Sequence, residues 1–430
     1  MKLRIARDFD LLWAGESISA LGTQLSTLAL PTLAILDLHA SAFEVGVLAA
    51  CSFGGYPVAG ILGGPSIDRL PRRAVMLATN GVRAAVLFAI PLAALAGQLA
   101  LWQLYVAGVG VSAATALFDT AYQAHLPSLV PAERLLGANA RLETSQNVAY
   151  FAGPGVAGVL IQAIGAVATI AGDALSYVWS FAMVALIHPD GRVASETPRR
   201  SVVGELRAGI ALYRSYPYLP SLGLCVAISN SGNLMVRALF LLVAYRAFGL
   251  TPSAAGLILA AGGVMGIVGA SMAGAISARL GIGRSLAVAT FVEGAAWCLT
   301  PLGMLGEPAL VLAIAAGISG FMTPVWNVNN VTLRQTLVRP DEQGRIVAVA
   351  RAFGTAGIPI GTFAGGALAV ALTPVLGTEA GLITALVAGS VIAAGSVVPL
   401  LVAGIPRIRR WSDLAALSGS RLFSGSGASE

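Results

Sequence analysis

The chain has 430 residues, of which 57% are hydrophobic and only 11% are Asp, Glu, Lys or Arg. A soluble globular protein covers its surface with polar side chains, so this composition excludes that class and indicates a polytopic helical membrane protein. The formal net charge of +6 would suit a nucleic-acid-binding protein, but cytoplasmic loops of membrane proteins are also rich in Arg and Lys, so we predict no nucleic-acid partner.

Twelve apolar segments follow one another along the chain, separated by clusters of charged residues, Gly or Pro. A spanning helix needs about 20 predominantly apolar residues, and each segment meets that length. They form two sets of six, which predicts an N-terminal bundle in 1–188 and a C-terminal bundle in 217–404. The predicted spans are 9–37, 42–67, 74–96, 100–125, 137–164, 166–188, 217–245, 252–278, 285–304, 308–333, 345–372 and 376–404.

Two polar segments flank the second set. Residues 189–216 form a predicted cytoplasmic linker with five arginines, and its apolar residues follow helical spacing. This pattern predicts an amphipathic helix on the membrane surface, with basic residues facing anionic headgroups. Residues 405–430 are basic and then rich in Ser and Gly, which predicts a disordered cytoplasmic tail. The apolar linker residues are Val202, Val203, Leu206, Ile210 and Tyr213.

The basic residues orient the chain in the membrane. If it starts in the cytoplasm and the segments alternate, 22 of the 26 Lys and Arg residues fall in cytoplasmic parts. Both termini are therefore predicted to be cytoplasmic. Lys2 is the only lysine, which fits a GC-rich bacterium. We predict a multi-pass protein of the bacterial cytoplasmic (inner) membrane, targeted by its first helix.

The two halves echo each other, as in transporters built from repeats. Phe118–Gly137 and Trp326–Gly344 both end a helix, share Leu-Val followed by Pro, and open the next helix after an acid. Gly274–Arg284 is a degraded copy of the charged cassette Gly64–Arg73. We interpret the chain as an internal duplication.

Two motifs point to movement between helices. In the cassette, Gly64 permits a close helix approach and Asp68 suits a helix N-cap. A loop that only fixes topology is the alternative. In the fifth span, Gly153, Pro154 and Gly158 belong to a small-residue motif that allows tight helix contact and a bend. An ordinary Gly-rich packing face is the alternative there.

Ionisable residues inside the spans are candidates for proton or cation binding. A lone charge in hydrocarbon costs at least ~2.5–3.5 kcal/mol, so Glu16, Arg83, Asp119, Asp173 and Glu293 must each face a cavity or a partner. A carboxyl group binds a proton more readily when it is buried. We predict that Glu16 and Asp173, with Arg83, couple protons to the substrate. A purely structural pairing with Arg83 is the alternative.

The cassette resembles the loop signature Gly-x-x-x-Asp-Arg-x-x-Arg-Arg of the major facilitator superfamily. Together with LLWAGESISALG, ILDLHASAFEVG, FDTAYQAHLPSLVPAERLLGANA and GDALSYVWSF, it makes most of residues 7–404 resemble the branch of macrolide efflux proteins and the enterobactin exporter. The resemblance implies an all-α fold of twelve transmembrane helices in two six-helix bundles. The helix-5 motif resembles that of exporting antiporters, with Ala157 in place of one Gly.

The resemblance also implies roles for individual residues. Gly64, Asp68, Arg69 and Arg72 would form a conformational latch, and Asp119 is the nearest match for the acid that pairs with Arg72. Pro71 stands where Gly is common and leaves the turn geometry open. Helices 3, 6, 9 and 12 are peripheral in this family, which weakens Asp173 and Glu293 as candidates. Helices 1, 4, 7 and 10 line the cavity, which assigns to the lining Asn230, Asn233, Arg237, Trp326, Asn327 and Asn330.

An apolar cavity with scattered amides suits a bulky amphiphilic substrate, although amides also join helices by hydrogen bonds. The sequence contains no nucleotide-binding loop, metal-ligand spacing or nucleophile triad, so we expect no enzyme activity, cofactor or metal. We predict a monomeric secondary transporter that exports a drug, antibiotic or siderophore-like compound by proton antiport. A proton-coupled nutrient importer and a non-transporting membrane receptor are the alternatives.

Overall fold

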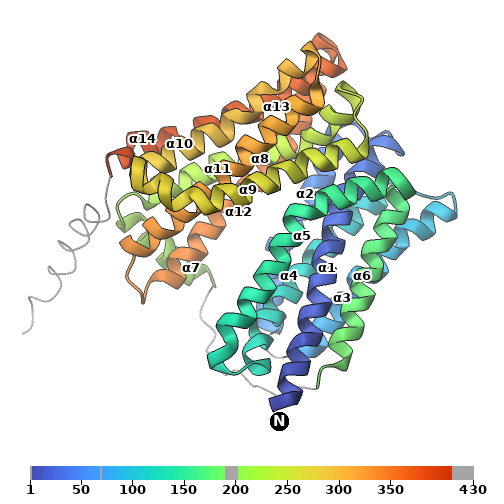
Figure 1. The fold of residues 1–430 in the computed structure, drawn as a ribbon, viewed down its shortest axis with the longest axis vertical. Coiled ribbons are helices and arrows are strands. Elements are labelled where there is room, and N and C mark those ends of the chain that lie inside the picture. Colours follow the sequence, from blue (N-terminus) through green and yellow to red (C-terminus); the bar gives the residue numbers. More distant parts are fainter. Residues whose placement is uncertain (1, 68–69, 189–201, 409–430) are drawn as a thin grey trace, which may run out of the picture. The chain divides into compact units, whose positions relative to one another are not determined.

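The computed structural model describes residues 2–67, 70–188 and 202–408, and this part of the chain consists of helices joined by short loops, without strands (Figure 1). A π turn, Val243–Ala247, extends α8, and a 3₁₀ segment, Ala296–Leu305, extends α10. The helices are α1 (Lys2–Leu36), α2 (Ala42–Ile67), α3 (Arg72–Leu95), α4 (Leu101–Leu129), α5 (Leu135–Ile164), α6 (Ala166–Leu186), α7 (Val202–Ser215), α8 (Leu219–Leu242), α9 (Pro252–Leu280), α10 (Ile282–Ala295), α11 (Pro308–Leu337), α12 (Gln343–Leu376), α13 (Thr378–Gly395) and α14 (Val398–Val402).

Every predicted span corresponds to a helix. Eleven helices in the described part are long and apolar enough to cross a membrane, and Ala42–Gly55 of α2 is a shorter apolar stretch. The prediction of an all-α polytopic membrane protein is therefore confirmed. Cys51, Cys225 and Cys298 are free thiols.

The chain divides into two compact units. Unit 1 comprises Met1–Thr197, Ala238–Ala260 and Gly366–Leu382, and unit 2 comprises Pro198–Arg237, Ala261–Gly365 and Ile383–Glu430. The unit boundaries fall inside α8, α9, α12 and α13. The bundle, linker and tail boundaries drawn from the sequence stay predictions.

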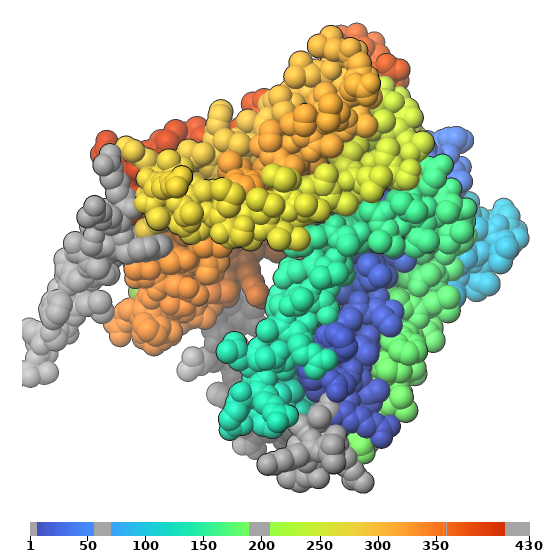
Figure 2. All heavy atoms as spheres, in the orientation of Figure 1, coloured from blue at the N-terminus to red at the C-terminus, as the bar shows by residue number. Residues whose placement is uncertain are grey.

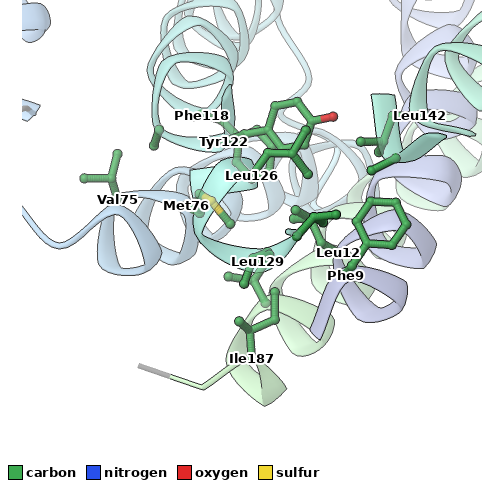
Figure 3. Close-up of a cluster of buried hydrophobic side chains, with 14 residues drawn as sticks. Phe9, Leu12, Val75, Met76, Phe118, Tyr122, Leu126, Leu129, Leu142 and Ile187 are labelled. Carbon is green, nitrogen blue, oxygen red and sulfur yellow. The ribbon is translucent and has the colours of Figure 1, made fainter. Parts of the chain in front are cut away.

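In unit 1, helices α1 and α3–α6 pack around a shared core (Figure 1). Figure 2 shows α1 enclosed between α5 and α6 on the face in view. At one end, side chains from all five helices converge in a buried cluster (Figure 3). These are the ends that the sequence places on the cytoplasmic side, and large apolar residues close them. The cluster includes Phe9, Leu12, Val75, Met76, Phe118, Tyr122, Leu126, Leu129, Leu142 and Ile187.

In unit 2, the helix of the predicted linker packs on protein. Tyr213 of α7 is buried and lies 5.5 Å, between ring centroids, from Phe353 of α12. The Tyr216 hydroxyl donates a hydrogen bond to Glu342. Burial and this carboxylate raise the pKa of Tyr216 above its usual range. Tyr213, one of the apolar residues that the sequence assigns to the membrane surface, therefore contributes to the core of unit 2, and the side chains of Val202, Val203 and Leu206 lie outside the described part.

Candidate functional site

A chain of hydrogen bonds joins Arg83 on α3 to Glu16 on α1. Arg83 donates to Asn80 Oδ1, and Asn80 Nδ2 donates to Ser180 Oγ on α6 at 2.9 Å. Ser180 Oγ then donates to Glu16 Oε1 at 3.3 Å. Every group donates toward Glu16, so the aligned dipoles stabilise an ionised carboxylate at the end of the chain. Glu16 is half-buried, whereas Asn80 and Ser180 are fully buried.

Arg83 itself is held between two aromatic rings. Its Cζ lies 4.4 Å from the ring centroid of Phe118 on α4 and 4.4 Å from that of Tyr177 on α6. A cation over an aromatic face is stabilised by the ring quadrupole, more strongly when water is excluded. Only 2% of Arg83 is exposed, and its Nε has no hydrogen-bond partner among the residues that the structure describes. The direct ion pairs found within 4 Å among the described residues do not include Arg83.

The predicted trio of ionisable residues therefore meets inside one unit. The charge of Arg83 acts on both Glu16 and Asp173. Within the described part of the chain, the guanidinium thus interacts electrostatically with both acids, without a direct ion pair to either within 4 Å. Proton coupling by these residues and a purely structural pairing with Arg83 both stay predictions.

Asp173 lies deeper than Glu16. It is fully buried on α6, where Ser176 Oγ donates to its Oδ1 at 3.1 Å, and its Oδ2 has no hydrogen-bond partner in the described part of the chain. One turn further along α6, the Tyr177 hydroxyl and Thr23 Oγ1 share a hydrogen bond of 2.8 Å. Hydroxyl groups of α1 and α6 thus surround Asp173, and Glu16 is the acid with access to the surface.

Gly22 allows α1 to approach α6 at this point. A Cβ atom on Gly22 would lie 2.1 Å from Ser176 Oγ and 2.6 Å from Asp173 Oδ1. Gly22→Ala is expected to destabilise the protein by about 1–3 kcal/mol, because overpacking forces the helices apart. Thermal unfolding of the purified protein in detergent measures the change.

Gly81→Ala is the matched control for Gly22→Ala. Gly81 lies on α3 of the same unit, and an added Cβ would find its nearest neighbour, a ring atom of Phe181, at 4.0 Å. This substitution is expected to gain roughly 0.5–1 kcal/mol, because Ala loses less backbone entropy than Gly. Equal unfolding temperatures for the two variants would contradict the tight contact at Gly22.

The helix-5 motif makes a backbone contact with α9 within unit 1. A Cβ on Gly158 would lie 2.5 Å from the carbonyl oxygen of Pro252 and 2.9 Å from Gly256 Cα. A Cβ on Gly256 would in turn lie 2.4 Å from the carbonyl oxygen of Pro154. The contact is reciprocal, so a side chain on either glycine would separate the helices. Gly153 packs with equal closeness on Gln24 of α1.

The structure describes only part of the charged cassette Gly64–Arg73. Gly64 lies in α2, and Asp68 and Arg69 lie outside the described residues. Arg72 donates from Nη1 to the carbonyl oxygen of Ala124 on α4 at 2.6 Å. Asp119, on the same helix, is half-buried and its charge acts on Glu16. The pairing of Arg72 with Asp119 stays a prediction.

The predicted cavity residues of unit 2 divide into two groups. Asn230 donates to the carbonyl oxygen of Gly354 at 2.8 Å and so joins α8 to α12, and Asn233 donates to Ser229 at 3.3 Å. The bond of Asn230 joins two helices, as the alternative expects, whereas the bond of Asn233 lies within α8. The other group is accessible: Arg237 and Asn327 are exposed, Trp326 is half-buried, and Asn330 lines a small pocket with Arg334 and Tyr213.

Four residues of the hydrogen-bonded and aromatic network were not predicted from the sequence. Asn80 and Ser180 are small polar residues of a type that is common in membrane helices, and Phe118 and Tyr177 read as core aromatics. One signal was available, since Asn80 precedes Arg83 by three positions and so shares its helix face.

Comparisons with known proteins show which family this chain matches and which transporters are similar to it. The family model of the Major Facilitator Superfamily matches residues 12–362. Macrolide efflux protein A of Streptococcus pyogenes is 24% identical over 360 residues, which cover 82% of this chain and 87% of that protein. Multidrug efflux pump Tap of Mycolicibacterium fortuitum is 25% identical over 370 residues, 84% and 88% of the two chains. Enterobactin exporter EntS of Escherichia coli O139:H28 is 25% identical over 379 residues, 86% and 88% of the two chains.

Solved structures show the same fold. A bacterial homolog of the human lysosomal transporter Spinster, inward-facing and unoccupied, superposes with a TM-score of 0.71 at 14% identity, covering 97% of this chain and 99% of that one. Nucleoside transporter NupG superposes with a TM-score of 0.70 at 13% identity, covering 94% and 100%. The predicted twelve-helix fold is thereby confirmed.

Proposed function

Because the chain belongs to the Major Facilitator Superfamily, we propose that it exports a bulky hydrophobic or amphiphilic small molecule in exchange for protons. The observation that carries this proposal is the hydrogen-bond chain that ends at Glu16. The direction and substrate class are supported by relatives named for the efflux of macrolides, of multiple drugs and of enterobactin. The protein would act as a monomer in a bacterial cytoplasmic membrane, with both termini in the cytoplasm.

The charges of unit 1 suit a site that gains and loses a proton. Glu16 and Asp173 share the single guanidinium of Arg83. With both acids ionised the trio has a net negative charge, and with one acid protonated it is neutral. Because burial disfavours uncompensated charge, the trio should hold a proton until water or a cationic group reaches it.

Glu16 is the acid that exchanges the proton. It is half-buried, whereas Asp173 is enclosed by α1 and α6. When Glu16 loses its proton, the hydrogen bond from Ser180 and the charge of Arg83 stabilise the carboxylate. Asp173 is the second acid beside Arg83, and its carboxyl group interacts electrostatically with the same guanidinium. Protonation of Glu16 changes the net charge of unit 1, and through it the relative stability of the two transport orientations.

The other predicted site residues take supporting roles in this proposal. Gly64, Asp68, Arg69 and Arg72 form the latch of one orientation, and Arg72 already joins the start of α3 to α4. The contact of Gly158 with Gly256 provides a close-packed surface on which helices slide or separate. The exposed and half-buried residues Arg237, Trp326, Asn327 and Asn330 contact substrate.

A growth panel followed by vesicle transport tests the proposal. Cells that express the protein should tolerate one or more macrolides, cationic drugs or siderophores better than cells with an empty vector. Everted vesicles, which expose the cytoplasmic face, should accumulate that compound when their interior is acidified, and an uncoupler should release it. Proton-driven uptake of the compound into intact cells would instead identify an importer.

A further inference from the structure

If the two halves are aligned as repeats, Glu293 of the second half corresponds to Arg83 of the first half. The cassette Gly64–Arg73 aligns with Gly274–Arg284 from its first glycine, and the same register carried onward pairs Arg83 with Glu293. Each lies eleven residues after the first residue of its helix, α3 or α10. Gly22 and Gly232 keep the same register, and each packs tightly on the last long helix of its half, α6 or α13.

Glu293 sits in an environment unlike that of Arg83. It is half-buried, and Thr323 Oγ1 on α11 donates to its Oε1 at 3.0 Å. The charge of Glu293 also acts on the Cys225 thiol of α8. From α13, Ser390 Oγ donates to the carbonyl oxygen of the neighbouring Gly294 and accepts a hydrogen bond from Cys298 Sγ. Among the described residues, the groups that face Glu293 from these elements are hydroxyls and thiols, and none is a cation.

The partner of Glu293 belongs to a helix with predicted substrate contacts. Thr323 precedes Trp326 and Asn327 by three and four positions on α11, so the three residues share one side of that helix. Asn327 is exposed and Trp326 is half-buried. Glu293 is assigned to a peripheral helix by the family resemblance, yet its carboxyl group reaches the substrate-side helix through Thr323.

We propose that Glu293, with Thr323, is a second proton-binding site, located in the second half of the transporter. The proposal rests on proton-driven export as proposed above. A carboxyl group without a cationic partner in an apolar setting is stable as the neutral acid, in which its proton replaces the missing counter-charge. It releases the proton when the transport cycle brings water to α11. Each half would then have one exchangeable acid, Glu16 and Glu293, and export of a neutral compound would move two protons inward.

The proton-to-substrate ratio tests this site. In liposomes that contain the purified full chain, the ratio follows from the pH gradient that just balances a known substrate gradient. Glu293→Gln is expected to lower the ratio by one proton, because Gln accepts the bond from Thr323 but cannot ionise. Glu307→Gln, an exposed acid of the same half, is the control and should leave the ratio unchanged. An unchanged ratio in Glu293→Gln would overturn the second site.

Infrared spectroscopy in detergent keeps the test independent of transport. The wild-type protein should lose protonated-carboxyl bands between acidic and alkaline buffer, and Glu293→Gln should lack one of these bands while the band of Glu16 remains. Thr323→Val should shift the frequency of the Glu293 band, since the hydrogen bond is removed. A Glu293 band that persists in alkaline buffer would show a permanently protonated residue and contradict the proposal. Wild-type export without any proton coupling would reject the proposed function itself, and the second site with it.

Discussion

Glu16→Gln is expected to abolish proton-driven export while the protein still folds and inserts. The amide oxygen of Gln can accept the hydrogen bond that Ser180 donates to Glu16, so the contact between α1 and α6 is preserved. Gln cannot release a proton, so the charge of unit 1 no longer changes during the cycle. Accumulation of substrate in acidified everted vesicles measures export, and thermal unfolding in detergent measures stability.

Glu133→Gln is the matched control for this experiment. Glu133 is an exposed acid of the short turn between α4 and α5, outside the network of Arg83. It should export at the wild-type rate. If Glu16→Gln also exported normally under a pH gradient, the exchangeable proton would have to be assigned to another acid.

Arg83→Met is expected to lower stability strongly. Removing the guanidinium leaves the buried Asp173 and the half-buried Glu16 without their shared cation, and breaking a buried charge pairing costs about 3–5 kcal/mol. The loss of stacking between Phe118 and Tyr177 adds to this cost. Thermal unfolding and the yield of monodisperse protein measure the effect.

A double variant separates charge balance from packing. Arg83→Met combined with Asp173→Asn removes one cation and one anion, so it should recover much of the stability that Arg83→Met loses. Asp173→Asn alone should be less damaging than Arg83→Met. If the double variant is no more stable than Arg83→Met, the charges of Arg83 and Asp173 are not energetically coupled.

Much of the fold is predictable from the sequence because the bilayer imposes a length on every apolar segment. Glu16, Arg83 and Asp173 can also be identified as candidate site residues from the sequence, because a charge within an apolar segment needs a partner. Their grouping depends on how α1, α3 and α6 pack, which a single sequence does not encode in any local pattern. Asn80 and Ser180 link Arg83 to Glu16 by hydrogen bonds, and neither residue type is unusual in a membrane helix.

The packing partners of the helix-5 glycine motif and of α7 could not be predicted from the sequence either. The tight contact of Gly158 requires another glycine opposite, and nothing in the sequence of α9 distinguishes Gly256 from its many glycines. The apolar stripe of α7 fits a membrane surface and a protein surface equally well, and only the structure shows that Tyr213 packs against Phe353 of α12. Periodicity gives the direction of a helix face but leaves its partner open.

The exchange of substrate for protons is tested most directly with the purified protein in liposomes that enclose a pH-sensitive dye. Substrate that flows out of the liposomes down its own gradient, with no imposed pH gradient, should drive protons inward, and Glu16→Gln should show no such proton movement. Protons that leave together with the substrate, or substrate flow without any proton movement, would contradict proton antiport.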